Sequence, residues 1–275
     1  MNIIIDIPVR FCQTVAMETH EPIRAVCRAL DVLKAINRLR GGTLAEIAKA
    51  SDLPYATCFR IVQTLIHEGM VAQEPFRKRY RATDMVLALS AGYQADDRLV
   101  SAARQPMEAF TARHLWPLGL TIRVGSRMLM KHTTHALTTQ TFEVYHPGDS
   151  QPIAESASGR VWLAFCSKEE RDMVLEGLTG QDPDSSLGLR LLRELSLLDA
   201  IRAQGYASYE RTPFNRTPGQ TSAIAVPLLW DGRVHGALTM VFFASAMPLS
   251  AAIARYVDPM QDLAGLIAAR ACPQP

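Results

Sequence analysis

Two short helical patterns lie close together between residues 43 and 65, and this pair restricts the fold more than any other feature of the chain. The first begins at Thr43, which has the spacing to Glu46 of a capping box, in which each residue satisfies a free backbone N–H of the other. The second begins after Pro54, a residue suited to the first turn of a helix. One apolar face repeats along it every three or four positions, at Cys58, Ile61, Val62 and Leu65. A short helix, a turn and a second helix form the helix-turn-helix arrangement.

The outer face of the second helix carries side chains that suit DNA. In a helix-turn-helix motif this helix enters the major groove and reads bases from its N-terminal half. Arginine can bind guanine through two hydrogen bonds, glutamine can pair with adenine, and an aromatic edge can contact a thymine methyl. A hydroxyl near the helix start is better placed for a phosphate. The residues predicted to face DNA are Tyr55, Thr57, Phe59, Arg60 and Gln63.

A further helix and a β-hairpin are expected on either side of this pair. The helix spans residues 22–39 and ends at Gly41-Gly42. Its predicted inner face consists of Val26, Leu30, Leu33 and Leu39. Residues 70–83 read as two short strands around a turn at 75–78. The basic residues at its tip, Arg77, Lys78 and Arg79, predict a wing that contacts phosphates, although taken alone they would also fit a solvated loop.

Charge is distributed unevenly along the chain. Residues 22–83 hold eleven basic and five acidic side chains, a net of +6, whereas the whole chain carries only +2. The rest of the chain is therefore mildly acidic, at −4. A small basic module joined to an acidic one is expected of a DNA-binding head on a separate sensing body.

Composition excludes several classes of protein. Of 275 residues, 48% are hydrophobic and 20% charged, which is ordinary for a globular protein. No apolar run approaches the roughly 18 residues needed to span a bilayer. Residues 1–21 lack the basic start of a secretory signal and are expected to be an N-terminal extension. The five cysteines include no CxxC pair, which disfavours a disulfide framework or a zinc site and fits the reducing cytoplasm.

Beyond Trp116 the sequence pattern changes, and strands are expected together with helices. Residues 118–124 alternate between apolar and polar and are followed by a turn at Gly125-Ser126. Two later apolar runs flank Asp231-Gly232, the strongest hairpin signal in the chain. Helices are expected over about 158–166, 168–178, 191–204 and 250–270. Strands that meet at hairpins, with helices between them, predict an α+β domain built on an antiparallel sheet.

The N-terminal motifs resemble the winged helix-turn-helix head of the IclR family of bacterial transcription regulators. The family patterns are matched by Arg24, Arg28, Ala29 and Leu30, by Leu44 to Ala48, and by Leu53, Pro54, Thr57 and Arg60. The resemblance implies that Arg24 and Arg28 approach the DNA from the first helix. One difference is Tyr55-Ala56, where the family often has Lys-Ser. The implied organisation is a winged helix-turn-helix domain at 22–83, linker helices at 84–112 and a GAF-like effector-binding domain at 113–275.

The C-terminal sequence looks closest to one branch of that family, the activators of phenylpropionate and hydroxyphenylpropionate catabolism. The phrases that carry this likeness are HLWPLGLTIR, KHTTH, ASGRVWLAFCS, SAIAVPL and FFASAM. The resemblance implies a homodimer or homotetramer that binds a double-stranded promoter operator and responds to a small, aromatic carboxylic acid. RNA polymerase is a further candidate partner, and no cofactor is expected.

An acid-sensing site can also be argued from the residues themselves. At the start of the helix expected at 158–166, free N–H groups and the helix dipole favour a carboxylate. Gly159 would let a ligand approach the backbone, and Arg160 can add a cation. The other candidate effector-binding residues are Thr121, Arg123, Ser158 and Thr239, with Ser222 added by the resemblance. The candidate apolar walls are Trp116, Trp162 and Phe242. Arg160, Trp162 and Thr239 also have ordinary structural interpretations, as surface, core and strand residues.

Two other functions compete with a sensing regulator. An enzyme would need a catalytic motif, and the chain has neither a GxSxG elbow nor a Walker-type loop. His132 and His135 form an HxxH pair, but their rings point to opposite faces of a strand, so no metal site is expected. Cys166 follows an apolar run, which favours a buried thiol over a nucleophile. The other alternative is a DNA-binding regulator whose C-terminal domain only oligomerises.

Overall fold

The structure, a computed structural model, describes residues 23–91, 98–141, 145–179, 195–210 and 221–272. The chain forms two compact units, residues 1–94 and residues 95–275, and each is described by itself. Within the described residues no helix combines the length and apolar character that a membrane span requires.

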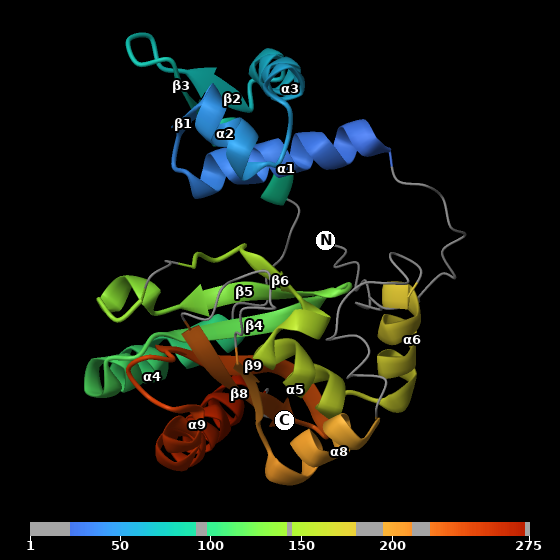
Figure 1. The fold of residues 1–275 in the computed structure, drawn as a ribbon, viewed down its shortest axis with the longest axis vertical. Coiled ribbons are helices and arrows are strands. Elements are labelled where there is room, and N and C mark those ends of the chain that lie inside the picture. Colours follow the sequence, from blue (N-terminus) through green and yellow to red (C-terminus); the bar gives the residue numbers. More distant parts are fainter. Residues whose placement is uncertain (1–22, 92–97, 142–144, 180–194, 211–220, 273–275) are drawn as a thin grey trace, which may run out of the picture. The chain divides into compact units, whose positions relative to one another are not determined.

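The N-terminal unit is a winged helix-turn-helix (Figure 1). Its helices are α1 (Arg24–Arg38), α2 (Leu44–Ala50) and α3 (Tyr55–His67), followed by a 3-10 helix, η1 (Asp84–Ser90). Its strands β1 (Gly42–Thr43), β2 (Val71–Gln73) and β3 (Arg79–Ala82) form an antiparallel sheet in the order β1-β3-β2. The predicted helix-turn-helix and wing are confirmed.

The buried face of α1 differs from the prediction. Val26 and Leu30 are 53% and 48% exposed, and Leu39 is 36% exposed. Leu33 is buried as predicted, and the other buried residues of α1 are Val32, Ala35 and Ile36. Both sets satisfy helical spacing, so the periodicity of the sequence could not choose between them. From Arg24 to Asp31 of α1 no residue is buried, so the helix packs against the unit mainly through its C-terminal half.

The C-terminal unit is built on a six-stranded antiparallel sheet in the order β6-β5-β4-β9-β8-β7. The strands are β4 (Leu118–Val124), β5 (Arg127–Thr133), β6 (Ser150–Pro152), β7 (Ala207–Glu210), β8 (Thr221–Trp230) and β9 (Arg233–Phe243). Asp231 and Gly232 both have positive φ, 49° and 68°, as a two-residue type I′ turn requires. The predicted β8–β9 hairpin and the α+β fold class are confirmed.

Helices cover both faces of this sheet (Figure 1). One face packs against α4 (Arg98–His114) and α9 (Leu249–Ala271), and the other against α5 (Ala157–Phe165), α6 (Lys168–Thr179) and α8 (Leu195–Gln204). Alternating residues of one strand therefore enter two different cores. In β8, Ile224 and Val226 lie in the core beneath α4 and α9, whereas Ala225 lies in the core beneath α5.

The described parts of the segment expected as linker, 84–112, belong to different units. Val86 of η1 packs against the core of the N-terminal unit. Ala103 and Met107 of α4 are fully buried in the C-terminal unit, in the core that α4 shares with α9. The second half of the expected linker is therefore one layer of the C-terminal fold.

Candidate nucleic-acid interface

The two faces of α3 separate as the sequence predicts. Cys58 and Val62 are fully buried and anchor the helix to α1 and α2. The residues predicted to read DNA lie on the other side: Tyr55, Phe59, Arg60 and Gln63 are exposed, and Thr57 is half-buried. Tyr55 is 60% exposed and Phe59 43% exposed, although both are large and partly apolar. An aromatic, a guanidinium and an amide are thus presented together on one helix.

The turn between α2 and α3 is fixed by backbone geometry. The N–H of Leu53 donates to the carbonyl of Ala48 at 3.0 Å, and the Ser51 hydroxyl donates to the carbonyl of Ile47 at 2.8 Å. Asp52 adopts a left-handed conformation with φ 52°, which lets the chain reverse within a few residues. The angle at which α3 is presented is therefore set by α2.

The wing is a closed hairpin with a basic tip. The N–H of Glu74 donates to the carbonyl of Arg79 at 2.8 Å, and the Glu74 carboxylate accepts from Arg81 Nη1 at 3.0 Å. Arg77 and Lys78 are exposed, and neither makes a hydrogen bond or ion pair with the part of the chain that the structure describes. Both cations are available to a phosphate.

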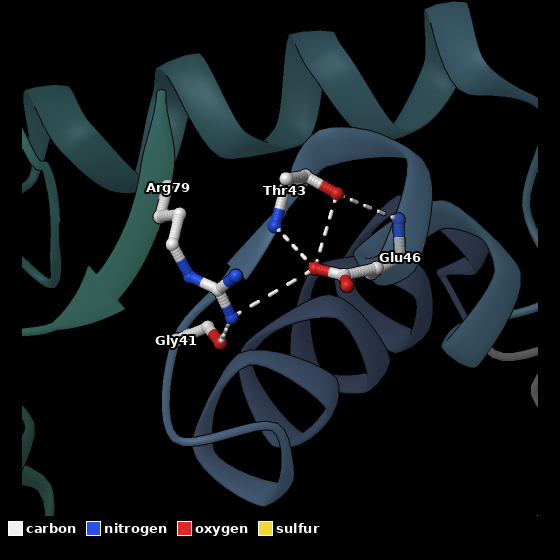
Figure 2. A network of polar contacts seen from close by, with 4 residues as sticks. All are labelled: Gly41, Thr43, Glu46 and Arg79. Carbon is white, nitrogen blue, oxygen red and sulfur yellow. Dashed lines mark hydrogen bonds and ion pairs between the residues drawn. The ribbon is translucent and has the colours of Figure 1, made fainter. Parts of the chain in front are cut away.

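Arg79, the third predicted cation of the tip, turns back to the body of the unit (Figure 2). Its Nη2 donates to the carbonyl of Gly41 at 2.8 Å and lies 3.9 Å from Glu46 Oε2. Glu46 also accepts from the Thr43 backbone N–H at 2.8 Å, which confirms the capping box. The hydrogen bonds from the Thr43 backbone and hydroxyl, with a smaller contribution from the charge of Arg79, lower the pKa of Glu46. Arg79 therefore connects the wing to the start of α2.

The two arginines predicted to contact DNA from α1 lie on its less buried half. Arg24 is exposed and Arg28 is partly exposed. Within the described residues, neither side chain forms a hydrogen bond or an ion pair. Their contact with DNA stays a prediction.

Three candidate effector-binding residues lie on the sheet face that α5 covers. The Thr121 hydroxyl donates to the carbonyl of Ala237 at 3.4 Å, while the buried Thr239 hydroxyl has no hydrogen-bond partner in the part of the chain that the structure describes. The Arg123 guanidinium carbon lies 4.6 Å from the ring centroid of Trp162 on α5. A cation, an indole ring and an unsatisfied hydroxyl thus occur on the same side of the sheet.

The start of α5 is more closely packed than predicted. Ser156 is its N-cap, and its hydroxyl accepts the Gly159 N–H at 3.1 Å, so that donor is already satisfied. A Cβ added at Gly159 would lie 1.8 Å from the carbonyl oxygen of Ile153. The expectation that Gly159 leaves room for a ligand is therefore wrong, because the Ile153 backbone fills that space. Ser158 is 3% exposed and its hydroxyl donates to that of Ser156 at 3.3 Å.

Arg160 turns inward and is held by β7. Its Nη1 donates to the carbonyl of Ser208 at 3.2 Å, and its guanidinium carbon lies 4.5 Å from the ring centroid of Tyr209. Among the described residues its buried Nε has no hydrogen-bond partner, and burial lowers the pKa of the guanidinium. Arg171 of α6, which the sequence analysis did not single out, is only 8% exposed, and its Nε likewise has no partner within the described ranges. Arg171 lies in a helix with an ordinary amphipathic sequence, so no motif indicated that its side chain would be buried.

The remaining effector candidates lie on the opposite face of the sheet. Trp116 and Phe242 pack edge to face at 6.2 Å in the core beneath α4 and α9, so they do not line the α5 side with Trp162. Ser222 pairs with Phe242 and alternates with Ala223, which places it on that same face. Successive residues of a strand point to opposite faces of the sheet. Trp116, Ser222 and Phe242 therefore cannot share a site with Thr239, which lies on the other face.

The two histidines of the HxxH pair lie on different elements: His132 is on β5, whereas His135 begins the 3-10 helix η2 (His135–Leu137), so the expectation that both lie on one strand is wrong. Among the described residues, no group of three or more His, Cys, Asp or Glu side chains could hold an ion. Both rings are buried, and neither Nε2 has a hydrogen-bond partner in the described part of the chain. Cys166 is also buried, and this raises the pKa of its thiol to about 12, as expected for an unreactive cysteine.

Comparison with known proteins shows a similarity to DNA-binding regulators. Residues 25–75 match the model of the IclR helix-turn-helix domain. The chain is 24% identical over 164 residues to the transcriptional regulator TsaQ1/TsaQ2 of Comamonas testosteroni, a match that spans 58% of each chain. It is 28% identical over 199 residues to the transcriptional regulator BhcR of Paracoccus denitrificans, which covers 70% of this chain and 69% of BhcR. These relatives are regulators, not enzymes.

The fold is also shared with solved structures. One is an IclR homologue from Microbacterium hydrocarbonoxydans, solved in complex with 4-hydroxybenzoate. It is 20% identical, with a TM-score of 0.60, over 90% of this chain and 98% of the other. At this identity the likeness concerns the fold.

Proposed function

We propose that this chain, an IclR-type DNA-binding transcriptional regulator and not an enzyme, is controlled by a small aromatic carboxylic acid. It would act in the cytoplasm on an operon for the catabolism of phenylpropionate-like compounds. The observation that carries this proposal is the stacking of Arg123 on Trp162, on the same side of the sheet as the buried hydroxyl of Thr239, which has no hydrogen-bond partner among the described residues. A guanidinium suits a carboxylate, and an aromatic wall suits a ring.

The DNA-binding half of the proposal rests on the N-terminal unit. Arg60 and Gln63 on α3 would read base edges, while Arg77 and Lys78 on the wing would bind phosphates. Arg24 and Arg28 would approach the backbone from α1. A helix-turn-helix protein reads two half-sites as a dimer. We therefore include a homodimer or homotetramer on a promoter operator, with RNA polymerase as a further partner.

The effector half rests on the C-terminal unit. Thr121, Arg123 and Thr239 from the sheet, with Ser158 and Arg160 from α5, would surround the acid. The solved relative that holds 4-hydroxybenzoate supports an aromatic acid as the class to test. The acid can regulate only if it binds one arrangement of the protein more tightly than another.

A thermal-shift screen of the full-length chain tests the effector. The panel contains pyruvate, glyoxylate, benzoate, 4-hydroxybenzoate, phenylpropionate and its ring-hydroxylated forms. An acid that binds only the folded protein, at about 100 times its dissociation constant, adds roughly 2.7 kcal/mol to the free energy of unfolding. A shift confined to arylpropionates supports the proposal. Stabilisation by pyruvate alone contradicts the aromatic class, and a panel without any shift favours a C-terminal domain that only oligomerises.

A further inference from the structure

The tip of the wing carries an aromatic ring that is almost fully exposed and therefore does not contribute to the core of its unit. Phe76 is 97% exposed, the highest value among the exposed large hydrophobic residues of the described chain. It precedes Arg77 and Lys78, two exposed cations without an internal partner among the described residues. Phosphate contact explains the cations, but it does not explain an apolar ring between them and Pro75.

The ring is presented by a hairpin that is braced at several points. The Arg81–Glu74 ion pair at 3.0 Å and the backbone bond from Glu74 to Arg79 at 2.8 Å close the hairpin below the tip. Arg79 then attaches it to Gly41. The base of the wing is therefore attached to the same unit that carries α3, and the tip extends beyond these contacts.

We propose that Phe76 is an apolar minor-groove contact of the wing and inserts its ring at a base step while Arg77 and Lys78 bind the flanking phosphates. This inference rests on the proposed DNA-binding function. The minor groove, about 6 Å wide, admits a side chain but not a helix. Apolar wedges such as phenylalanine enter it between base pairs, which they partly unstack. Flexible pyrimidine–purine steps yield most readily, so the ring selects for such a step beside the α3 site.

The test uses full-length protein and a duplex selected by the wild type from a random-sequence library. Affinity is measured by fluorescence anisotropy from low to physiological salt. A 2-aminopurine placed at each step beside the α3 site reports unstacking. We expect Phe76→Ala to weaken binding about tenfold at every salt concentration, with an unchanged salt slope and no 2-aminopurine signal. Phe76→Leu, which keeps an apolar wedge, should retain most of the affinity and most of the 2-aminopurine signal.

Arg77→Ala is the matched control on the same tip. Removal of one phosphate contact should reduce the slope of log affinity against log salt by about 1. If Phe76→Ala lowers that slope in the same way, or binds and unstacks DNA like the wild type, the inference is overturned.

Failure of the proposed function gives a different result. If the wild type selects no duplex, DNA binding itself is contradicted, and this inference goes with it. If the wild type selects a duplex, and the Phe76 variants bind and unstack it as the wild type does, the proposed DNA binding stands and only the inference about Phe76 fails. The thermal midpoint of Phe76→Ala should equal that of the wild type, because an exposed ring adds nothing to the core.

Discussion

Arg79 of the wing donates a hydrogen bond to the carbonyl oxygen of Gly41 at 2.8 Å, which connects the tip hairpin to the turn that precedes α2. The same guanidinium lies 3.9 Å from Glu46 in the capping box of that helix (Figure 2). One side chain thus joins two structures that were predicted separately. Of the three consecutive cations Arg77, Lys78 and Arg79, only Arg79 is bound to the rest of the N-terminal unit among the described residues, and the next prediction follows from that difference.

Arg79→Ala should destabilise the N-terminal unit, whereas Arg77→Ala should not. Loss of one hydrogen bond from a charged donor costs roughly 1.5–3 kcal/mol when it is well formed, and less here because the side chain is 38% exposed. We expect about 1 kcal/mol, measured as the difference in unfolding free energy by urea titration. Equal stability of the two variants would contradict a structural role for Arg79.

Arg60→Ala should weaken operator binding by roughly 1–3 kcal/mol and relax the preference at one base position. The reason is that Arg60 lies on the exposed face of α3 without an internal partner among the described residues. Binding is measured on a set of duplexes that differ at single positions. Arg270→Ala, an exposed arginine on α9, is the charge-matched control. Uniform weakening on every duplex would make Arg60 a phosphate contact.

Gly159→Ala should be strongly destabilising, by about 3 kcal/mol or more, because the new methyl group would meet the Ile153 carbonyl at 1.8 Å. Gly265→Ala in α9 is the matched control, since nothing lies within 4 Å of the added Cβ. That helical substitution should stabilise by roughly 0.5–1 kcal/mol. Thermal unfolding of both variants is the measurement. A small loss of stability for Gly159→Ala would contradict the prediction, because it would show that the backbone at the start of α5 can move away from Ile153.

Arg123→Gln should weaken the binding of the stabilising acid by about tenfold or more, as expected when a charged hydrogen-bond donor is lost. Arg127→Gln, on the neighbouring strand, is the charge-matched control: Arg127 binds Ser150 through Nε and Nη2, whereas Arg123, which donates from Nη1 to the carbonyl of Gly125 at 3.1 Å, lies over the Trp162 ring. Isothermal titration with the acid found in the screen measures both. An unchanged dissociation constant for Arg123→Gln would place the acid elsewhere.

Stability should fall as the pH is lowered from about 6.5 to about 4, and His135 should account for part of that loss. Burial lowers the pKa of His135 to about 4 in the folded protein, followed by a smaller effect of His146. Over this interval the unfolded chain binds a proton that the folded chain does not, so stability rises with pH and is fully present above about 6.5. The loss of unfolding free energy that His135 causes between pH 6.5 and pH 4 is on the order of 3 kcal/mol. Urea unfolding of the wild type and of His135→Gln at pH 7 and pH 5 measures this loss. If both proteins show the same pH dependence, the role given to His135 is contradicted.

Local signals in the sequence determined most of the secondary structure and the fold class. The Thr43–Glu46 capping box, the spacing of buried residues along α3 and the Asp231-Gly232 turn all act over a few residues, so each could be identified without knowledge of the rest. The basic charge of residues 22–83 likewise pointed to DNA.

The tertiary structure alone decided which neighbours these elements meet. Val32 and Ile36, not Val26 and Leu30, form the buried face of α1, because helical periodicity permits both and only packing selects one. Gly159 is small because the backbone of Ile153 passes over it.

The candidate effector site was divided for the same reason. Ser222 and Thr239 looked equivalent in sequence, but strand alternation and register place them on opposite faces of one sheet. Arg79 resembled its neighbours at the wing tip until Gly41, 38 residues away, proved to be its partner. Short-range spacing fixes the conformation of an element, whereas contacts between residues distant in sequence depend on how the elements pack, and no local pattern encodes that.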